Sequence, residues 1–436
     1  MLRNVFKKSR LGVILALALT LCFAGAPAAF ATGDPITGSE EAPVTAGITK
    51  ILKMPVGTIT PNSTFLFTAT PISTDGDISI LPPTIEDSAM TVDFSSADTS
   101  AAVDGVISIA LETGDIFADV EFPHAGVYVY QIREAQDTNT DIDENSKHEV
   151  LTYSKALYTL SVYVKNDTED NGTYIYAIGA VFNTKDNGNP GAGDKVDPTP
   201  GGGAGFDYSQ MIFTNTYVKT NGAEKPETPN PGDEDESTLS VSKTVAGSFG
   251  SKTQYFDYTI SLSLPSLATN APAFYRAYVV DTASASVVTS LENAAEGLIA
   301  QDGGGDYIKM AIGSSTDFSL KDGQKLVFVD TPVGTTYSVN ERGAAAYLAS
   351  VDVFTAGEKV ATAAGASVGA PVTILNQLVG EMKNSADFTN TRNDVTPTGL
   401  NLADLPFIGM IALAVAALVA FIVAKSRKKT FLEDQA

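Results

Sequence analysis

The sequence predicts an all-β protein with two tandem β-sandwich domains, an N-terminal signal peptide and a C-terminal transmembrane helix. Short runs rich in Val, Ile, Thr, Tyr and Phe alternate with turn residues through most of the chain, which is typical of strands. Helical periodicity outside the two ends is confined to one short candidate at residues 291–300. An acidic, Pro- and Gly-rich stretch divides the chain, and an apolar segment lies near each end.

Residues 1–31 have the composition of a secretory signal peptide. Basic residues precede an apolar core at 11–24, and a small-x-small cleavage site ends at Ala31. Cys22, the only cysteine, lies inside this segment. The exported protein is therefore expected to lack disulfides, the usual covalent staple outside the cell.

Residues 220–237 have the composition of a flexible linker, because they are polar, acidic and rich in Pro and Gly. They separate residues 32–219 from residues 238–394, and each of these parts is the size of one ordinary domain. We expect the linker to keep the two domains energetically separate. A second Gly- and Pro-rich stretch, 183–205, is interpreted as a long loop inside the first domain.

Residues 395–436 combine a short motif, an apolar run and a basic tail. The run at 405–424 is long enough to cross a bilayer as a helix, and the basic cluster behind it stays on the cytoplasmic side. The motif at 395–399 resembles a Gram-positive cell-wall sorting signal of the VPTG type, with Thr396 at the position expected for Val. That resemblance implies sortase cleavage between Thr398 and Gly399 and attachment to the cell wall. The alternative is a single-span membrane protein.

The composition argues against several functions. A formal net charge of −23 disfavours nucleic acid or anionic membranes as the main partner, since both attract basic patches. His124 and His148 are the only histidines, which leaves little for a metal site or for Ser-His or Cys-His catalysis. We expect no cofactor, no metal and no enzymatic activity on an external substrate.

Polar residues interrupt the apolar face of three predicted strands in each half of the chain. Residues i, i+2 and i+4 of a strand share one side. In chain order the interrupted rows are Ile48, Lys50, Leu52; Tyr128, Tyr130, Ile132, Glu134; Met211, Phe213, Asn215, Tyr217; Leu239, Val241, Lys243, Val245; Tyr337, Val339, Glu341; and Phe388, Asn390. Any one polar member could be a strand-edge residue that reaches solvent. Lys, Glu and Asn recurring in the same order and phase instead predict two inward-facing triads.

Such a triad could form a covalent bond within its own domain. Burial lowers the pKa of a lysine, so more of it is the nucleophilic neutral amine. The asparagine offers an amide carbon, and a desolvated carboxyl group of raised pKa could polarise that carbonyl and shuttle protons. Loss of ammonia would leave a Lys–Asn isopeptide bond between the first and last strands. Loop-closure arithmetic gives about 4–5 kcal/mol of stabilisation for such a cross-link.

Six sequence blocks carry a resemblance to a known family. They are ITK (48–50), VYVYQIRE (127–134), FTNTY (213–217), SVSKTVAG (240–247), TYSVNE (336–341) and FTNTRND (388–394). The chain resembles the two-domain streptococcal backbone pilins with isopeptide-linked, Ig-like, CnaB-related domains. The resemblance implies the bonds Lys50–Asn215 and Lys243–Asn390, promoted by Glu134 and Glu341.

The resemblance also implies polymerisation, in which a pilin sortase joins the sorting-motif Thr of one subunit to a lysine of the next. Thr398 would be the acyl donor. The matching acceptor region holds only Lys185 and Lys195, both in the Gly- and Pro-rich stretch. Lys165, in VYVKN (162–166), is similar to the lysine of the YPKN pilin motif, but the Pro is missing and the segment could simply be a strand end.

Two functions remain open from the sequence. The first is a pilus shaft subunit or related wall-anchored stalk, whose partners are a sortase and neighbouring pilin subunits or peptidoglycan. The second is a monomeric wall-anchored adhesin that binds a host or matrix ligand. The only chemistry expected in either case is self-directed bond formation.

Overall fold

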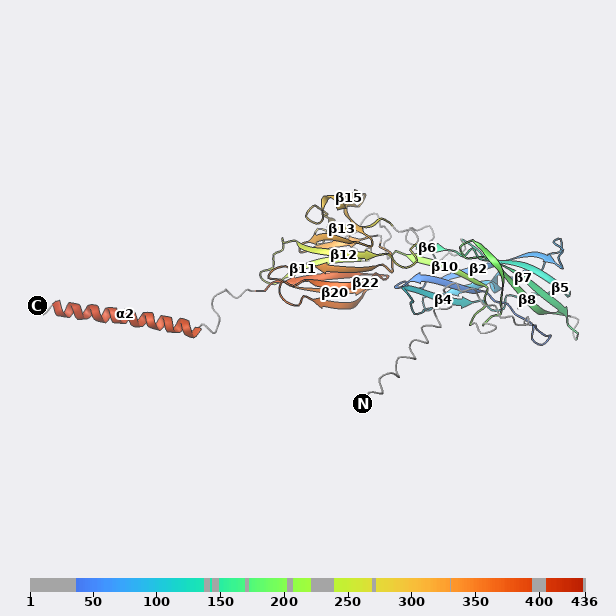
Figure 1. Ribbon diagram of the computed structural model, residues 1–436, viewed down its shortest axis with the longest axis horizontal. Helices are drawn as coiled ribbons and strands as arrows, with labels where there is room; N and C mark the ends of the chain where they lie inside the picture. Colours follow the sequence, from blue (N-terminus) through green and yellow to red (C-terminus); the bar gives the residue numbers. More distant parts are fainter. Residues whose placement is uncertain are drawn as a thin grey trace, which may run out of the picture.

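The computed structural model describes residues 37–136, 142, 149–168, 172–201, 207–220, 239–268, 272–329, 331–393 and 405–433. The predicted all-β class is confirmed, with a single apolar helix in the described C-terminal part. Strands β1–β10 form one unit and strands β11–β23 a second, and the two lie end to end (Figure 1). These are called the N-terminal and C-terminal units below. The signal peptide and residues 221–237 of the predicted linker lie outside the described residues.

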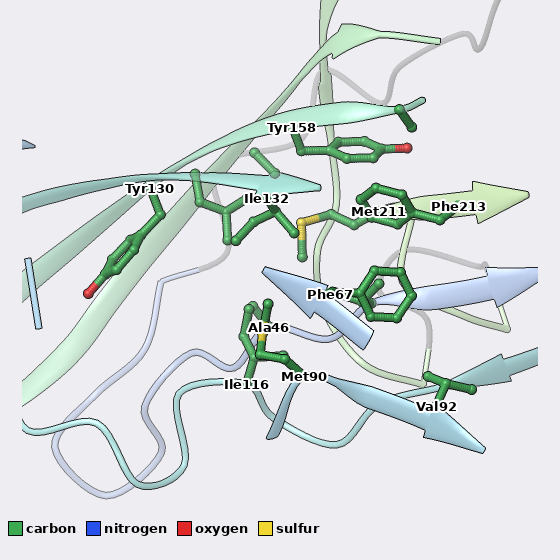
Figure 2. Packing of buried hydrophobic residues seen from close by; sticks show 14 of the residues in the cluster. Ala46, Phe67, Met90, Val92, Ile116, Tyr130, Ile132, Tyr158, Met211 and Phe213 are labelled. Atoms are coloured by element: carbon green, nitrogen blue, oxygen red, sulfur yellow. The ribbon is translucent and has the colours of Figure 1, made fainter. Parts of the chain in front are cut away.

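The N-terminal unit is a sandwich of two sheets. The four-stranded sheet has the order β4 (Val106–Glu112), β1 (Thr49–Pro55), β10 (Ile212–Lys219), β6 (Glu149–Thr152). The six-stranded sheet has the order β3 (Thr91–Phe94), β2 (Ser63–Thr74), β5 (Gly126–Glu134), β7 (Leu157–Asn166), β8 (Thr173–Thr184), β9 (Pro190–Val196), and a 3-10 turn, η1 (Asp87–Ala89), precedes β3. Apolar residues from both sheets meet between them, among them Phe67, Ile132 and Phe213 (Figure 2).

The C-terminal unit repeats this arrangement with a wider sheet. Its nine-stranded sheet contains β15 (Ile299–Asp302), β16 (Gly305–Ala311), β13 (Phe274–Asp281), β18 (Gln324–Phe328), β11 (Leu239–Ala246), β23 (Ser385–Thr391), β20 (Leu348–Thr355) and β21 (Glu358–Ala364) in this order, with β14 (Ser286–Val287) paired to β13. The four-stranded sheet has the order β17 (Ser315–Leu320), β12 (Phe256–Ser263), β19 (Thr336–Glu341), β22 (Val372–Leu378). A second buried cluster of apolar residues fills this unit.

First and last strands are neighbours in both units. Strand β1 pairs in parallel with β10, and β11 pairs in parallel with β23. Leu52 lies opposite Asn215, and Val245 lies opposite Asn390. The lysine two residues before Leu52 or Val245 therefore sits one step along the same face from the asparagine on the adjacent strand.

Two sequence predictions about local structure are wrong. Residues 183–205 are not simply a loop, because β9 lies within them and pairs with the end of β8. As an edge strand β9 tolerates Pro190 at its start, and a Cβ at Gly191 would meet the carbonyl oxygen of Phe182 at 2.6 Å. The helix candidate at 291–300 contains only a 3-10 turn, η3 (Glu296–Leu298), before β15 begins.

Direct contacts join the two units. The linker composition predicts two energetically separate domains and does not indicate these contacts. The backbone N–H of Val333 donates to the carbonyl oxygen of Lys219 at 2.8 Å. The Glu381 carboxylate accepts from the N–H of Ile59 at 2.8 Å and from the Lys219 ammonium at 3.2 Å. A Cβ at Gly334 would lie 2.5 Å from the Pro55 side chain, so the backbones approach closely.

Helix α2 (Leu405–Glu433) is long and apolar enough to cross a membrane over Phe407–Lys425, where the mean hydropathy is 2.9. The side chains described along this segment are exposed. Its position agrees with the span predicted from the sequence.

Candidate cross-linking sites

In the N-terminal unit, one carboxylate oxygen contacts two nitrogen atoms. Oε1 of Glu134 lies 2.5 Å from Nζ of Lys50 and 2.8 Å from Nδ2 of Asn215. The side chains of Lys50 and Glu134 are completely buried, and Asn215 has no exposed surface. The structure thus brings together the three residues that the strand phases align.

Strand pairing and sheet packing place these groups. Lys50 and Asn215 belong to the neighbouring strands β1 and β10 of one sheet, whereas Glu134 ends β5 in the facing sheet. The Lys50 ammonium also lies over the ring of Phe65, 4.5 Å from its centroid. An aromatic face stabilises a buried cation, so the ring helps to hold the amine in the core.

A backbone group completes this site. The N–H of Ser154, between β6 and β7, donates to Oδ1 of Asn215 at 2.7 Å and to Oε2 of Glu134 at 3.0 Å. This contact orients the Asn215 amide, with its oxygen toward Ser154 and its nitrogen toward Glu134. Sequence reasoning did not find Ser154, because every residue except proline carries a backbone N–H and no side-chain pattern marks this one.

The C-terminal unit repeats the arrangement. Oε1 of Glu341 lies 2.8 Å from Nζ of Lys243 and 2.5 Å from Nδ2 of Asn390. The Lys243 ammonium lies 4.1 Å from the centroid of the Phe256 ring. Both side chains of the Lys243–Glu341 pair are completely buried.

The two sites differ around the asparagine oxygen. Oδ1 of Asn390 is buried without a hydrogen-bond partner among the described residues. Tyr258 lies opposite Glu341 in the pairing of β12 with β19, at the place that Phe67 occupies opposite Glu134. The second site therefore has no counterpart, in the described part of the chain, of the Ser154 contact.

Burial shifts the pKa values of Lys50, Lys243 and Glu134 toward the neutral forms of these groups. It lowers the pKa of Lys50 to about 8, against the opposing effect of Glu134, and lowers the pKa of Lys243 to about 8, against Glu341. Burial also raises the pKa of Glu134, although Lys50 and the hydrogen bonds from Asn215 and Ser154 act in the opposite direction. Proton transfer from the lysine to the carboxylate therefore costs less in the first site than in water.

The remaining predicted residues lie on the surface or outside the described part. Lys185 is exposed in the turn after β8, and Lys195 is exposed on β9. Lys165 is exposed near the end of β7, with its ammonium 3.1 Å from the centroid of the Tyr176 ring. Thr398, Gly399 and His148 lie outside the described residues.

His124 is exposed, and its Nδ1 lies 3.0 Å from the carbonyl oxygen of Ala125. Within the residues that the structure describes, no group of three or more His, Cys, Asp or Glu side chains could hold a metal ion.

Comparisons with known proteins agree with the predicted resemblance. Residues 47–218 match the family described as the Spy0128-like isopeptide containing domain, and residues 237–392 match a domain of unknown function, DUF7601. A pilin from Streptococcus pyogenes serotype M1 is 23% identical over 319 residues, which cover 71% of this chain and 71% of that pilin.

Solved structures include the major pilin from Streptococcus pyogenes, with 18% identity and a TM-score of 0.30 over 81% of this chain and 99% of that one. The pilus-presented adhesin Spy0125 (Cpa) has 13% identity and a TM-score of 0.20 over 55% of this chain and 36% of the adhesin.

The chain is an all-β protein that is similar to pilins over most of its length. More particularly, the N-terminal unit matches the isopeptide-containing domain family. The resemblance to streptococcal backbone pilins is thereby confirmed.

Proposed function

We propose that this chain is a structural subunit of a Gram-positive surface pilus, stabilised by one intramolecular Lys–Asn isopeptide bond in each unit. The observation that carries the proposal is the shared carboxylate oxygen: in both buried sites it contacts the lysine nitrogen and the asparagine amide nitrogen together. A plain structural ion pair requires no asparagine on the same oxygen.

The geometry suits a proton shuttle. The Glu134 carboxylate takes a proton from the Lys50 ammonium, and the neutral amine attacks Cγ of Asn215. The carboxylic acid then returns the proton to Nδ2, the Cγ–Nδ2 bond breaks and ammonia leaves. A new Nζ–Cγ bond remains. Its nitrogen gives up its second proton through Glu134 to the departing ammonia, which leaves the site as ammonium, and Glu134 is regenerated as a carboxylate. Glu341, Lys243 and Asn390 take the same roles in the C-terminal unit.

Such bonds would replace the disulfides that the exported part of the chain cannot form. Each bond would join the first strand of a unit to its last, and so close a loop over nearly the whole unit. In a subunit that carries tension through its two ends, this cross-link would prevent the terminal strands β1 and β10, or β11 and β23, from separating.

The intact mass of residues 32–394, expressed alone, tests the cross-links. We expect a mass lower than the sequence mass by two molecules of ammonia, because each bond releases one. Peptide mapping should place the bonds at Lys50–Asn215 and Lys243–Asn390. An unchanged mass would refute the cross-links in both units, and the loss of one ammonia would restrict the proposal to one unit.

We also propose that a sortase attaches the protein to the cell wall through Thr398. The motif at 395–399 follows the last strand, β23, after a short segment and precedes the apolar helix α2, so a sortase could take it as an extended peptide. In the host, Thr398→Ala should leave the protein held in the membrane with its C-terminal segment intact. The check is the C-terminal peptide of wall-released protein, which should end at Thr398 in the wild type.

Wall extracts from the same host distinguish a shaft subunit from a monomeric adhesin. A shaft subunit should give an SDS-resistant ladder in wall extracts, and replacing the acceptor among Lys185, Lys195 and Lys165 should abolish it. All three side chains are exposed. Normal wall attachment without a ladder would instead favour the monomeric adhesin with a host-surface ligand.

A further inference from the structure

The proposed reaction in the N-terminal unit needs a group that the carboxylate does not supply. Attack of the Lys50 amine on Cγ of Asn215 moves negative charge onto Oδ1, and catalysis requires a hydrogen-bond donor aimed at that oxygen. Oε1 of Glu134 faces the two nitrogens, Nζ and Nδ2, rather than Oδ1. The Ser154 N–H is the donor recorded on Oδ1, at 2.7 Å.

Asp186 holds this donor in place. Its Oδ1 accepts from the Ser154 hydroxyl at 2.5 Å and from the N–H of Thr214 at 2.9 Å. Its backbone carbonyl accepts from the N–H of Lys155 at 2.9 Å. Asp186 thus ties the segment that carries the donor to β10, one residue before Asn215.

We propose that the Ser154 backbone N–H stabilises the oxyanion of the first cross-linking reaction and that Asp186 is its positioning residue. The inference rests on the proposed isopeptide chemistry and adds to it the group that polarises the amide carbonyl. The donor takes no part in the bond changes, in which Nζ–Cγ forms, Cγ–Nδ2 breaks and ammonia leaves. It lowers the activation barrier by donating a hydrogen bond that stabilises the negative charge developing on Oδ1.

The C-terminal unit is an internal control for this role. Oδ1 of Asn390 has no donor among the described residues. Asp322 raises the pKa of Lys243, as Asp186 raises that of Lys50. The Asp322 side chain, however, accepts hydrogen bonds from the N–H of Val245 and from the Lys252 ammonium. Changes at Ser154 or Asp186 should therefore slow the first bond and leave the second unaffected.

The sharpest test removes only the N–H. Cell-free synthesis of residues 32–394 can place either serine or its α-hydroxy analogue, glyceric acid, at position 154, so that the hydroxyl bound by Asp186 is kept in both. The two products differ in one backbone N–H, which becomes an ester oxygen. Ammonia loss in the N-terminal unit, followed by timed intact mass and peptide mapping, should be roughly 100-fold slower with the ester, the usual effect of losing one oxyanion donor. Equal rates for the two products would overturn the proposal.

Asp186→Ala tests the positioning role against an opposite expectation. The Asp186 charge raises the pKa of Lys50, so its loss as a mere charge would leave more neutral amine and speed the reaction. As a positioning residue, its loss should slow the first bond by roughly tenfold or more. Asp186→Leu, which has a similar shape but no acceptor atom, covers the case in which the alanine variant does not fold.

Stability is compared in a Lys50→Ala background, where no first bond can form. The positioning role of Asp186 is supported if Asp186→Ala leaves the thermal midpoint unchanged in the Lys50→Ala background and slows formation of the first bond in the protein that keeps Lys50. A first bond that forms at the wild-type rate or faster contradicts it. A wild type that loses no ammonia from its N-terminal unit refutes the cross-link proposal itself, which is a different result.

Discussion

Glu134→Ala is expected to leave the N-terminal unit without its cross-link, while the C-terminal unit still forms its own bond. Glu341→Ala should give the reverse. Each carboxylate contacts the lysine and asparagine of its own unit, so each variant should be heavier than the linked wild type by one ammonia, after allowance for the substitution. Loss of about 4–5 kcal/mol should lower the unfolding midpoint of the affected unit by roughly 10–20 °C.

Two further variants separate the bond from the charge pair. Glu134→Ala also leaves Lys50 buried without its carboxylate, which destabilises the unit in its own right. Lys50→Met removes the bond and the lysine charge but leaves the Glu134 carboxylate without its partner, and Asn215→Ala removes the bond but keeps the pair. Similar midpoints for all three would identify the missing bond as the main cause. A bond that still forms in Glu134→Ala would mean that this carboxylate is only an ion-pair partner.

Glu381→Ala is expected to loosen the junction between the two units without affecting either cross-link. Glu381 lies in the C-terminal unit, yet its carboxylate binds the N–H of Ile59 and the ammonium of Lys219 in the N-terminal unit. Its own N–H donates to the carbonyl oxygen of Gly57 at 3.3 Å. Hydrogen bonds to a charged group contribute about 1.5–3 kcal/mol each, so the variant should weaken the coupling between the units by an amount of that order.

Small-angle scattering and calorimetry measure this effect. The wild type should scatter as an extended particle with a single preferred arrangement of its units, and Glu381→Ala as a broader distribution. In calorimetry the transitions of the two units should move apart. Glu358→Ala, which removes an exposed carboxylate on β21, is the matched control. Identical scattering for wild type and Glu381→Ala would show that other contacts fix the relative arrangement of the two units.

The alternation of residues along the strands determined much of the candidate site. Because neighbouring side chains of a strand point to opposite faces, the positions of Lys50, Glu134 and Asn215 relative to their apolar neighbours already predicted which side each would face. The same reasoning applied to the second half of the chain. The all-β class followed from the same short β-rich runs, and the apolar helix from its length and composition.

Local periodicity failed where pairing with a distant segment decides the structure. Gly and Pro in residues 183–205 indicated a loop, but an edge strand needs backbone hydrogen bonds on one side only, so β9 forms against β8. In place of the helix predicted at 291–300, the structure has a turn in which the Asn293 side chain accepts hydrogen bonds from the N–H and hydroxyl of Ser290. Such side-chain bonds to nearby backbone compete with a helix.

The sequence by itself determined the strand phases, the apolar helix and the three residue types of each triad, and it predicts the export segment and the sorting motif. Only the tertiary structure decided that a carboxylate from one sheet reaches across the core to a lysine and an asparagine on two parallel strands of the other. It also decided the roles of Ser154, Asp186 and Glu381, since these depend on backbone groups and on contacts between distant segments. Such contacts are set by strand register and by the packing of sheets, and neither has a period that can be read along the chain.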